Sequence, residues 1–420
     1  MLYLTNYTNN IENQTEKRIT IADLEFLAIC MLSVLVVVFR MFGQDILIVS
    51  SIFLTFLLFF AFDKSFLSFI LYSKNFFLIY FAVALFSTII NIPFGNDNYV
   101  SGLIFTTSFI CLVFLGKYIS KSLIADKVVS FHTFFLAVSV VFGFIEFLTK
   151  KNILLSLFFV DNLTGTGRIC SFFVHPIIFS VFLIVFYWLV FLNKKMHWLI
   201  KSAFLIITIV CLYGTFSRSS WIAFLLTNMV YLLRNFIFKK ITPKKFILGI
   251  MLLSSAIIVM ATTGVFNIFV DGLVERISNI DESVSYLQRI GGWEYLIRDS
   301  FYNSNIVQLL FGHGYKGSFM SLLNTTIVIT GFFTTDNSYV SVFYNYGIIS
   351  FTIVLCLLLS LAVFLFSKRF DRYEYKGIVL SLIGIFSVAF FFEIDLFLNI
   401  ASYFYLYIGF FLTRKQGSLL

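Results

Sequence analysis

The chain has 420 residues, of which 60% are hydrophobic and 12% are charged, and its net charge is +9. Soluble domains carry about 25% charged residues, so this composition excludes an ordinary soluble protein. Apolar segments of about 20 residues recur along the whole length and predict an all-α polytopic membrane protein. The basic residues are spread over many short loops, which is a topology signal and does not indicate nucleic-acid binding.

We predict about 12 transmembrane helices, with one long polar interval between the ninth and the tenth. The expected spans are 21–39, 44–62, 75–90, 99–115, 128–148, 171–192, 198–213, 219–233, 246–265, 338–366, 377–392 and 397–413. Residues 1–20 are polar, so no cleavable signal peptide is expected and the first apolar segment should be a span. Segment 338–366 is longer than a bilayer requires, so it should tilt or protrude.

The chain is therefore divided into residues 1–270 with nine spans, a loop at 271–337, and residues 338–420 with three spans. Twenty-one of the 30 Lys and Arg residues fall in one set of alternate loops and nine in the other. The positive-inside rule then places both termini in the cytoplasm and the large loop outside. Arg dominates in the outer set, and its planar fork of donors suits phosphate better than Lys does.

The five Cys residues are scattered and form no CxxC pair, so neither a disulfide framework nor a zinc site is predicted. Oxygen ligands for a divalent metal are conceivable at Asp97, or at Glu393 with Asp395, but such residues more often lie solvated at the end of a span. No metal or other cofactor is expected. The absence of HExxH and Walker A motifs argues against a zinc protease or an ATPase.

Two short outer loops carry the first candidate ligands. Gly165 and Gly167 precede Arg168 and would let the backbone approach a ligand, and His175-Pro176 follows at the start of a span. The alternative is that Gly and Pro only shape the loop while Arg168 snorkels to the interface. Arg218 lies in Ser217-Arg218-Ser219 near a predicted helix start, where the macrodipole favours an anion. An interfacial Arg among lipid phosphates is the alternative.

The long loop supplies further candidates. Apolar residues after Asp281-Glu282-Ser283 recur at helical spacing and predict an amphipathic helix, with Arg289 and Arg298 beside its apolar stripe. The alternative for each Arg is a solvated or snorkelling residue on a surface helix, and this alternative is favoured for Arg298 but not for Arg289. Farther on, Gly312-His313-Gly314 predicts a tight turn, in which His313 could act as a base or be a plain loop residue.

Asp336 and Asn337 immediately precede the tenth span. Asp336 is a candidate N-cap of that helix. It is also a candidate general base for a sugar hydroxyl, because such a base must be a carboxylate or an imidazole within reach.

Taken in order, these short motifs resemble the O-antigen polymerase and ligase superfamily, and they are similar to Wzy-type capsule repeat-unit polymerases. The resemblance covers about residues 160–350. Its motifs are Gly167-Arg168, His175-Pro176, Thr215 with Ser217-Arg218-Ser219, Arg289 with Trp293, Gly312-His313-Gly314, Asp336-Asn337-Ser338-Tyr339 and Tyr346-Gly347. The ligase branch typically has a His before the Asn that corresponds to Asn337; this chain has Asp336, which weighs against a ligase.

The resemblance implies a GT-C-like, metal-independent glycosyltransferase of the bacterial cytoplasmic membrane that acts on undecaprenyl-diphosphate-linked oligosaccharides for O-antigen, lipopolysaccharide or capsule. Arg168, Arg218 and Arg289 would hold the diphosphate, and Asp336 or His313 would be the base. His175, Arg298 and Asn337 are secondary candidates. The expected partners are the lipid-linked donor and acceptor, membrane lipid and a chain-length regulator, with no nucleic acid. A ligase, a flippase of the same lipid-linked sugar and an accessory membrane protein are the alternatives. A flippase should show internal repeats and mid-membrane ionisable residues, and no repeat is evident.

Overall fold

The computed structural model describes residues 20–63, 66, 68, 70, 77–92, 98–152, 167–238, 284–323, 325, 334–373, 375–394 and 397–413. These residues form helices and no strand, as predicted for a helical membrane protein. The expected span 246–265 and residues 271–283 of the large loop lie outside the described residues, as do Asp97 and Asp395.

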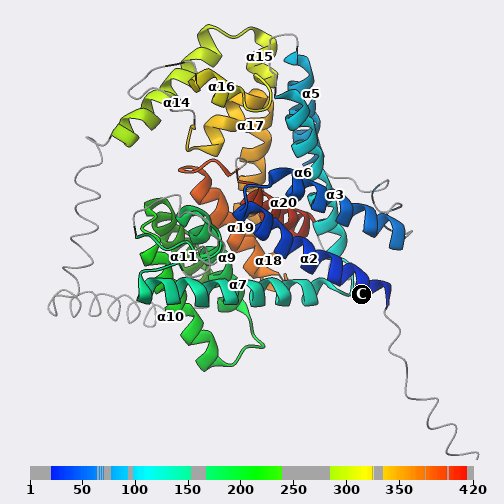
Figure 1. Cartoon of the computed structure of the whole chain (residues 1–420), viewed down its shortest axis with the longest axis vertical. Coiled ribbons are helices and arrows are strands. Elements are labelled where there is room, and N and C mark those ends of the chain that lie inside the picture. The colour runs from blue at the N-terminus through cyan, green and yellow to red at the C-terminus, as the bar shows by residue number, and fades with distance from the viewer. Residues whose placement is uncertain are drawn as a thin grey trace, which may run out of the picture.

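Eleven apolar helices make up the described bundle (Figure 1). They are α2 (Ile21–Met41), α3 (Asp45–Phe62), α5 (Leu78–Ile90), α6 (Tyr99–Ile119), α7 (Ala125–Thr149), α9 (Pro176–Leu192), α10 (Trp198–Gly214), α11 (Arg218–Ile237), α17 (Ser338–Leu365), α19 (Lys376–Ala389) and α20 (Leu398–Leu412). Five of them, namely α2, α6, α7, α11 and α17, are long and apolar enough to cross a membrane, and the other six are shorter. The total of 12 spans stays a prediction.

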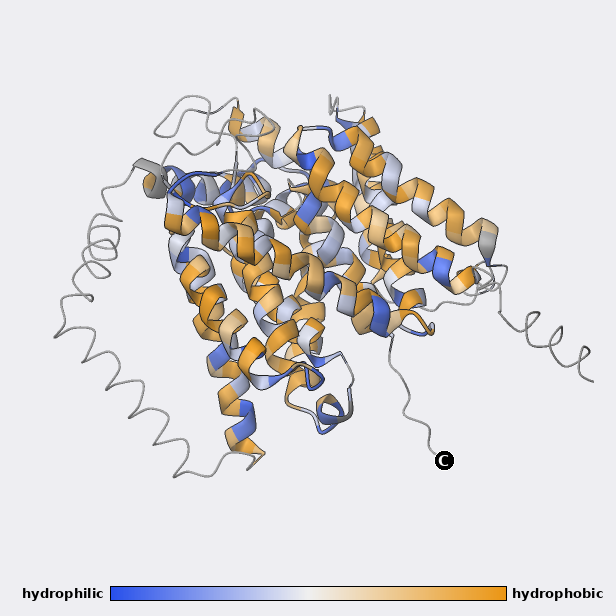
Figure 2. Cartoon of the chain, turned by 60° about the horizontal axis from the view of Figure 1, so that its bottom comes forward, coloured by the Kyte–Doolittle hydropathy of each residue, from blue (hydrophilic) through white to orange (hydrophobic). Residues whose placement is uncertain are grey.

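Large apolar side chains remain exposed on the outside of this bundle, and Figure 2 colours most of its helices as hydrophobic. Leu57 on α3, Leu225 and Met229 on α11, and Leu359 and Val363 on α17 are each at least 59% exposed. Water would penalise such a surface, whereas hydrocarbon accepts it. The exposed apolar faces therefore fit a membrane-embedded protein.

The centre of the bundle is formed by α9, α19 and α20, whose side chains are mostly buried. Helix α20 packs against α6 with direct backbone contact. A Cβ added to Gly116 would lie 2.0 Å from the carbonyl oxygen of Leu406, and one added to Gly409 would lie 2.3 Å from that of Val113. Small residues at these positions allow the close approach that drives helix association where no hydrophobic effect operates.

Two ion pairs join helix ends that are distant in sequence. At one end of the bundle the start of α7 meets the start of α2, where Lys127 lies 3.2 Å from Asp23. At the C-terminal end of α17, Arg234 of α11 lies 2.7 Å from Asp371 of α18 (Arg369–Arg372). These loops are the Lys-rich ones that the charge bias assigns to the cytoplasm.

Helix α17 is broken at Gly347, where φ is 75° and ψ is 179°. The turn at 312–314 is inserted at the break: the amide of His313 donates to the carbonyl of Tyr344 (3.0 Å) and that of Gly314 to Asn345 (2.8 Å). After the break, 348–365 is long enough to cross hydrocarbon at about 1.5 Å per residue. The break gives a physical reason for the excess length of segment 338–366.

The residues before the break belong to a separate layer of helices. Helices α14 (Val284–Tyr302), α15 (Ile306–Phe311) and α16 (Gly317–Leu323) lie beside the first part of α17, at the top of Figure 1. Leu296, Leu322 and Tyr344 form their small core. Helix α14 confirms the helix predicted in the long loop.

Candidate functional site

The site is built on the start of α17. The side chain of Asn337 accepts hydrogen bonds from the amides of Tyr339 (2.9 Å) and Val340 (3.2 Å), so Asn337 is the N-cap of the helix. The expectation that Asp336 would cap this helix is therefore wrong by one residue. Asp336 instead adopts a left-handed backbone conformation, with φ of 47°, just before the cap. Its carboxylate is thereby left to contact another element.

That element is α14, which places two side chains on the segment before α17. Arg289 Nε donates to Asp336 Oδ2 at 2.7 Å, and Trp293 Nε1 donates to the carbonyl of Thr335 at 2.6 Å. The two residues are four apart, so they lie on one helical face. The Trp293 ring also meets Phe390 edge to face, with centroids 6.0 Å apart. Helix α14 is thus docked by polar contacts directly onto the candidate base.

The same segment is anchored from the bundle side by Glu393, which follows α19 and is 6% exposed. Its Oε2 accepts from the amide (3.3 Å) and hydroxyl (3.0 Å) of Thr335, and its Oε1 accepts from the Ser341 hydroxyl (2.5 Å). A buried carboxylate satisfied in this way holds its partners firmly. Glu393 therefore positions the residues beside Asp336.

A second group of candidates lies on the turn before α9, which Glu146 of α7 holds in place. Its carboxylate accepts from the amides of Cys170 (3.1 Å) and Ser171 (2.7 Å). The amide of Ile169 bonds the carbonyl of Gly214 at the end of α10 (3.1 Å). These bonds fix the backbone that carries Arg168.

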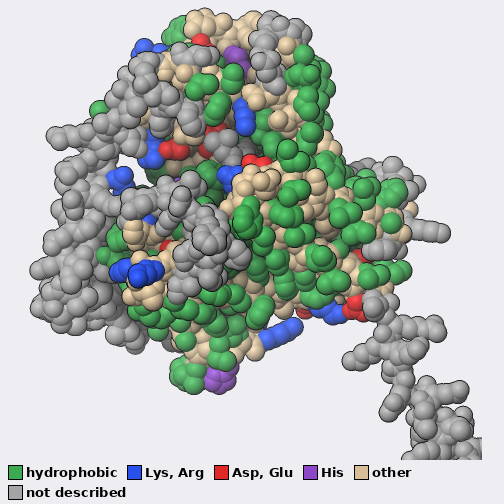
Figure 3. Space-filling view, viewed as in Figure 1, with side chains coloured by type: hydrophobic (Ala, Val, Ile, Leu, Met, Phe, Trp, Pro, Cys, Tyr) green, Lys and Arg blue, Asp and Glu red, His purple; other side chains and the backbone are tan. Residues whose placement is uncertain are grey.

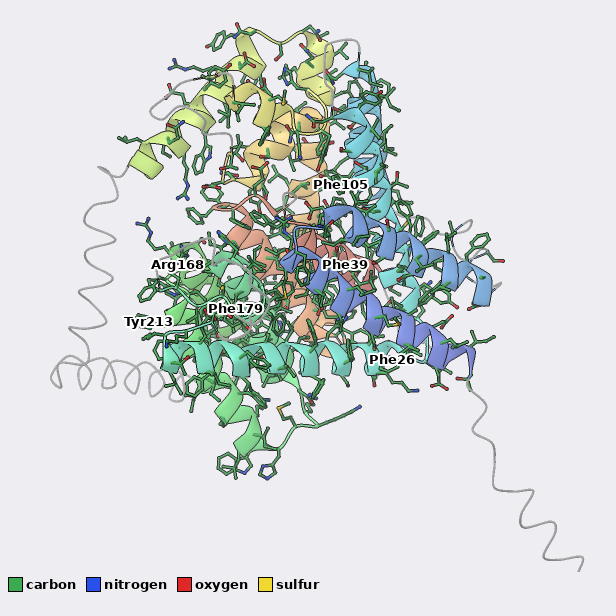
Figure 4. The ribbon with its side chains drawn as sticks, in the orientation of Figure 1. Phe26, Phe39, Phe105, Arg168, Phe179 and Tyr213 are labelled. Atoms are coloured by element: carbon green, nitrogen blue, oxygen red, sulfur yellow. The ribbon has the colours of Figure 1, made fainter. Side chains whose placement is uncertain are left out.

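Arg168 and Arg218 border one turn. Arg168 Nε donates to the carbonyl of Thr215 (2.8 Å), and Arg218 is the first residue of α11, three residues farther on. Figure 4 labels Arg168 close to Tyr213, at the edge of the bundle that faces α14. Ser217 occupies the N-cap position but makes no side-chain capping bond. As expected, Arg218 stands where a helix dipole repels cations, and a bound anion would relieve that repulsion.

His175 lies between these groups. Its Nδ1 accepts from the amide of Ile177 (3.3 Å), which makes it the N-cap of α9. Its ring packs against Phe392 and Phe397, with centroids 5.8 and 5.7 Å away. Burial, and then the positive charges of Arg168 and Arg40, lower the pKa of His175 to about 4. The ring is therefore neutral at pH 7 and serves as a cap with two cations near it.

Arg40, at the end of α2, is a site residue that the sequence analysis did not select. It pairs with Asp45 at 2.6 Å, and its guanidinium carbon lies 5.4 Å from the Phe397 ring centre. The one feature of the sequence that could have selected Arg40 is that it lies in the loops predicted to be outside, which carry few basic residues. Glu146 and Glu393 were likewise visible as acids at outer ends, but their backbone partners are distant in sequence.

The structure separates two predicted residues from this group. His313 stacks on Tyr344 (4.1 Å), its Nε2 lies 2.9 Å from the Ser304 hydroxyl, and burial lowers its pKa. Tyr344 lies six residues beyond Ser338, the first residue of α17, or about 9 Å along the helix, and Asp336 precedes Ser338. His313 and Asp336 are therefore not a pair. Arg298 forms an exposed ion pair with Glu294 on its own helix (2.6 Å).

The remaining candidates form a group that we call the polar belt. It consists of the Arg289–Asp336 pair, Glu393 with its partners Thr335 and Ser341, His175, Arg168 and Arg218. Figure 3 shows basic and acidic side chains gathered around the hollowed part of the surface below α14. Several guanidinium groups and one carboxylate that is 22% exposed could bind a polyanion and exchange a proton. Compared with protein-family models, curated proteins and solved structures, the chain matches none.

Proposed function

We propose that the protein is a metal-independent glycosyltransferase with a GT-C-like fold that polymerises undecaprenyl-diphosphate-linked oligosaccharide repeat units on the outer side of the bacterial cytoplasmic membrane. The observation that carries the proposal is the Arg289–Asp336 pair at the start of α17, at 2.7 Å. It joins a phosphate-binding group to a proton acceptor. The turn that holds Arg168 and Arg218 and the motifs in the sequence support it further.

The chemistry requires two actions. A hydroxyl oxygen of the acceptor attacks the anomeric carbon of the donor sugar, and the bond from that carbon to the diphosphate oxygen breaks. Negative charge then develops on the leaving diphosphate. Preorganised donors on Arg168, Arg218 and Arg289 would stabilise that charge, and guanidinium groups suit phosphate oxygens in a bidentate arrangement.

Asp336 would take the proton of the attacking hydroxyl. Before substrate binds, its carboxylate is engaged by Arg289. A diphosphate carries more negative charge than one carboxylate and would compete for the guanidinium. Donor binding would then free Asp336 for the acceptor hydroxyl, so that proton removal becomes possible only when the donor is present. The left-handed backbone at Asp336 would hold the carboxylate at the surface during this exchange.

The test uses the purified protein in lipid with one lipid-diphosphate-linked repeat unit and no other acceptor, and resolves the products by size. A ladder of multiples is expected. The triple variant R168A/R218A/R289A should make none, whereas the matched control R298A should keep the ladder. Transfer only after a core oligosaccharide is added would instead indicate a ligase. Flipping without transfer would indicate a transporter, and a fully active triple variant would overturn the proposed site.

The orientation can be tested independently. In a variant without native Cys residues, Lys316→Cys should react with an impermeant thiol reagent added from outside the cell. Lys316 follows the turn at 312–314 in the outer layer of helices. If that thiol is protected in intact cells and labelled only after lysis, the orientation is the reverse of the one predicted.

A further inference from the structure

A groove of about 440 Å³ has a lining that includes none of the residues of the polar belt. It lies between α7 and α10 and ends at the turn that joins α9 to α10. Its walls are mostly apolar and include Phe134, Val138, Val141, Phe142 and Phe204. Phe134 is 66% exposed and Val141 is 43% exposed. In hydrocarbon, a groove with such walls is filled by an apolar chain.

The end of the groove at the turn between α9 and α10 is polar and basic. Asn193 lies in its lining, and Lys201 Nζ donates to the carbonyl of Asn193 (3.3 Å). Lys194 and Lys195 follow directly in the chain and are exposed. Lys195 lies 3.6 Å from Asp126, the one carboxylate that a described ion pair brings to Lys194, Lys195 or Lys201. This end of the groove therefore carries excess positive charge.

The neighbouring residues place this end at a membrane surface. Trp198, the first residue of α10, is 66% exposed. Exposed Trp is enriched where headgroups meet hydrocarbon. The same end of the bundle carries the Lys127–Asp23 contact and the Lys-rich loops. Charge bias assigns this side to the cytoplasm, whose leaflet offers anionic lipids.

We infer that the groove is a binding site for one anionic phospholipid, with an acyl chain along α7 and α10 and the headgroup phosphate at Lys194 and Lys195. Charge complementarity selects this occupant, because a basic pocket between transmembrane helices on the cytoplasmic side recognises anionic headgroups. The inference does not depend on the proposed glycosyl transfer. Its site involves neither the Arg residues nor the carboxylate of the polar belt.

The test is native mass spectrometry of the full chain in a neutral detergent, titrated with dioleoyl phosphatidylglycerol or dioleoyl phosphatidylcholine. One phosphatidylglycerol should be retained in clear preference to phosphatidylcholine. Val141→Trp should fill the groove and abolish that retention, while Leu148→Trp, at a 64% exposed position of the same helix, should not. The variant K194Q/K195Q should bind about 30-fold more weakly, at roughly fivefold per lysine, whereas K368Q/R369Q should bind normally.

Three outcomes would overturn the inference. Equal retention of the two lipids would remove the headgroup recognition. Unchanged binding by Val141→Trp would show that the chain does not occupy this groove. Displacement of phosphatidylglycerol by an equal concentration of a polyprenyl phosphate would assign the groove to a substrate lipid.

Discussion

Arg289 donates a 2.7 Å hydrogen bond to Asp336 across 47 residues of chain. The donor comes from the second turn of α14 and the acceptor precedes the cap of α17. Their side chains are 32% and 22% exposed, so the pair is partly shielded from water. A bond of this kind both fixes α14 against the bundle and restrains the one carboxylate that the polar belt offers as a base.

Replacing Asp336 by Asn tests the base without disturbing the backbone. Asn tolerates the left-handed region that Asp336 occupies and has nearly the same shape. Asn Oδ1 can still accept the hydrogen bond from Arg289 Nε, so we expect the Tm to fall less than in Arg289→Ala. The rate of chain elongation should fall by about 10²–10⁴, because a general base contributes a factor of that size. Elongation at the wild-type rate in the Asn variant would show that Asp336 is not the general base.

Arg289 and Arg298 should differ sharply, although both lie on α14. Arg289→Ala leaves the Asp336 carboxylate without a charged partner and should lower the free energy of unfolding by about 1–3 kcal/mol, as for other hydrogen bonds to charged groups. Arg298→Ala removes an ion pair whose side chains are 71% and 56% exposed, and it should change the free energy by less than about 0.5 kcal/mol. Thermal unfolding in one detergent measures both. Equal effects would contradict the placement of Arg289.

His175 should make stability depend on pH. Its pKa is about 4 in the folded protein and near 6.5 when exposed, so the unfolded chain binds more protons between these values. Its contribution is complete above pH 6.5 and is lost as the pH falls toward 4. Between pH 7 and 4.5, the wild type should lose roughly 1–3 kcal/mol more than His175→Asn does. Asn can still cap α9, so parallel pH curves for the two proteins would contradict the burial of the ring.

Gly347→Ala should destabilise the protein severely. A Cβ at this position would lie 2.2 Å from the carbonyl oxygen of Leu310, and the backbone has φ of 75°. Gly43 offers a matched control, because it has φ of +67° but no atom within 4 Å of an added Cβ. Gly43→Ala should cost only the left-handed strain of about 1–2 kcal/mol. A drop in Tm for Gly347→Ala no larger than for Gly43→Ala would show that the inserted turn is not tightly packed.

Hydropathy predicts the helices of the bundle because each is apolar, whether its side chains lie on the outside of the bundle or in its core. It does not separate a buried turn from a helix. The span expected at 171–192 begins only at Pro176. Phe172 and Phe173 are as apolar as a helix interior, yet they lie in an irregular turn that Glu146 anchors, with Ser171 and Val174 at positive φ. The conformation of this turn depends on Glu146, which lies 25 positions before Ser171 in the chain.

The candidate site was predictable to the extent that local chemistry determines it. The turn at Gly312-His313-Gly314 is present, with both glycines at positive φ. The position of this turn inside the break of α17 could not be predicted, because it depends on a partner more than 30 residues away. In the same way, Asp336 could be recognised as a polar residue before a helix. Its pairing with Arg289 required the docking of α14, which depends on tertiary packing.

The Thr335–Glu393 bonds also impose an order on biosynthesis. A chain grows from its N-terminus at about 5–20 residues per second, and 58 residues separate the two partners. For several seconds after Thr335 is added to the growing chain, the carboxylate that must hold it has not been made. The Thr335–Glu393 bonds can form only after α19 and the residues that follow it have been made. A chain that ends before Glu393 should therefore lack the bonds that hold Thr335 and Ser341.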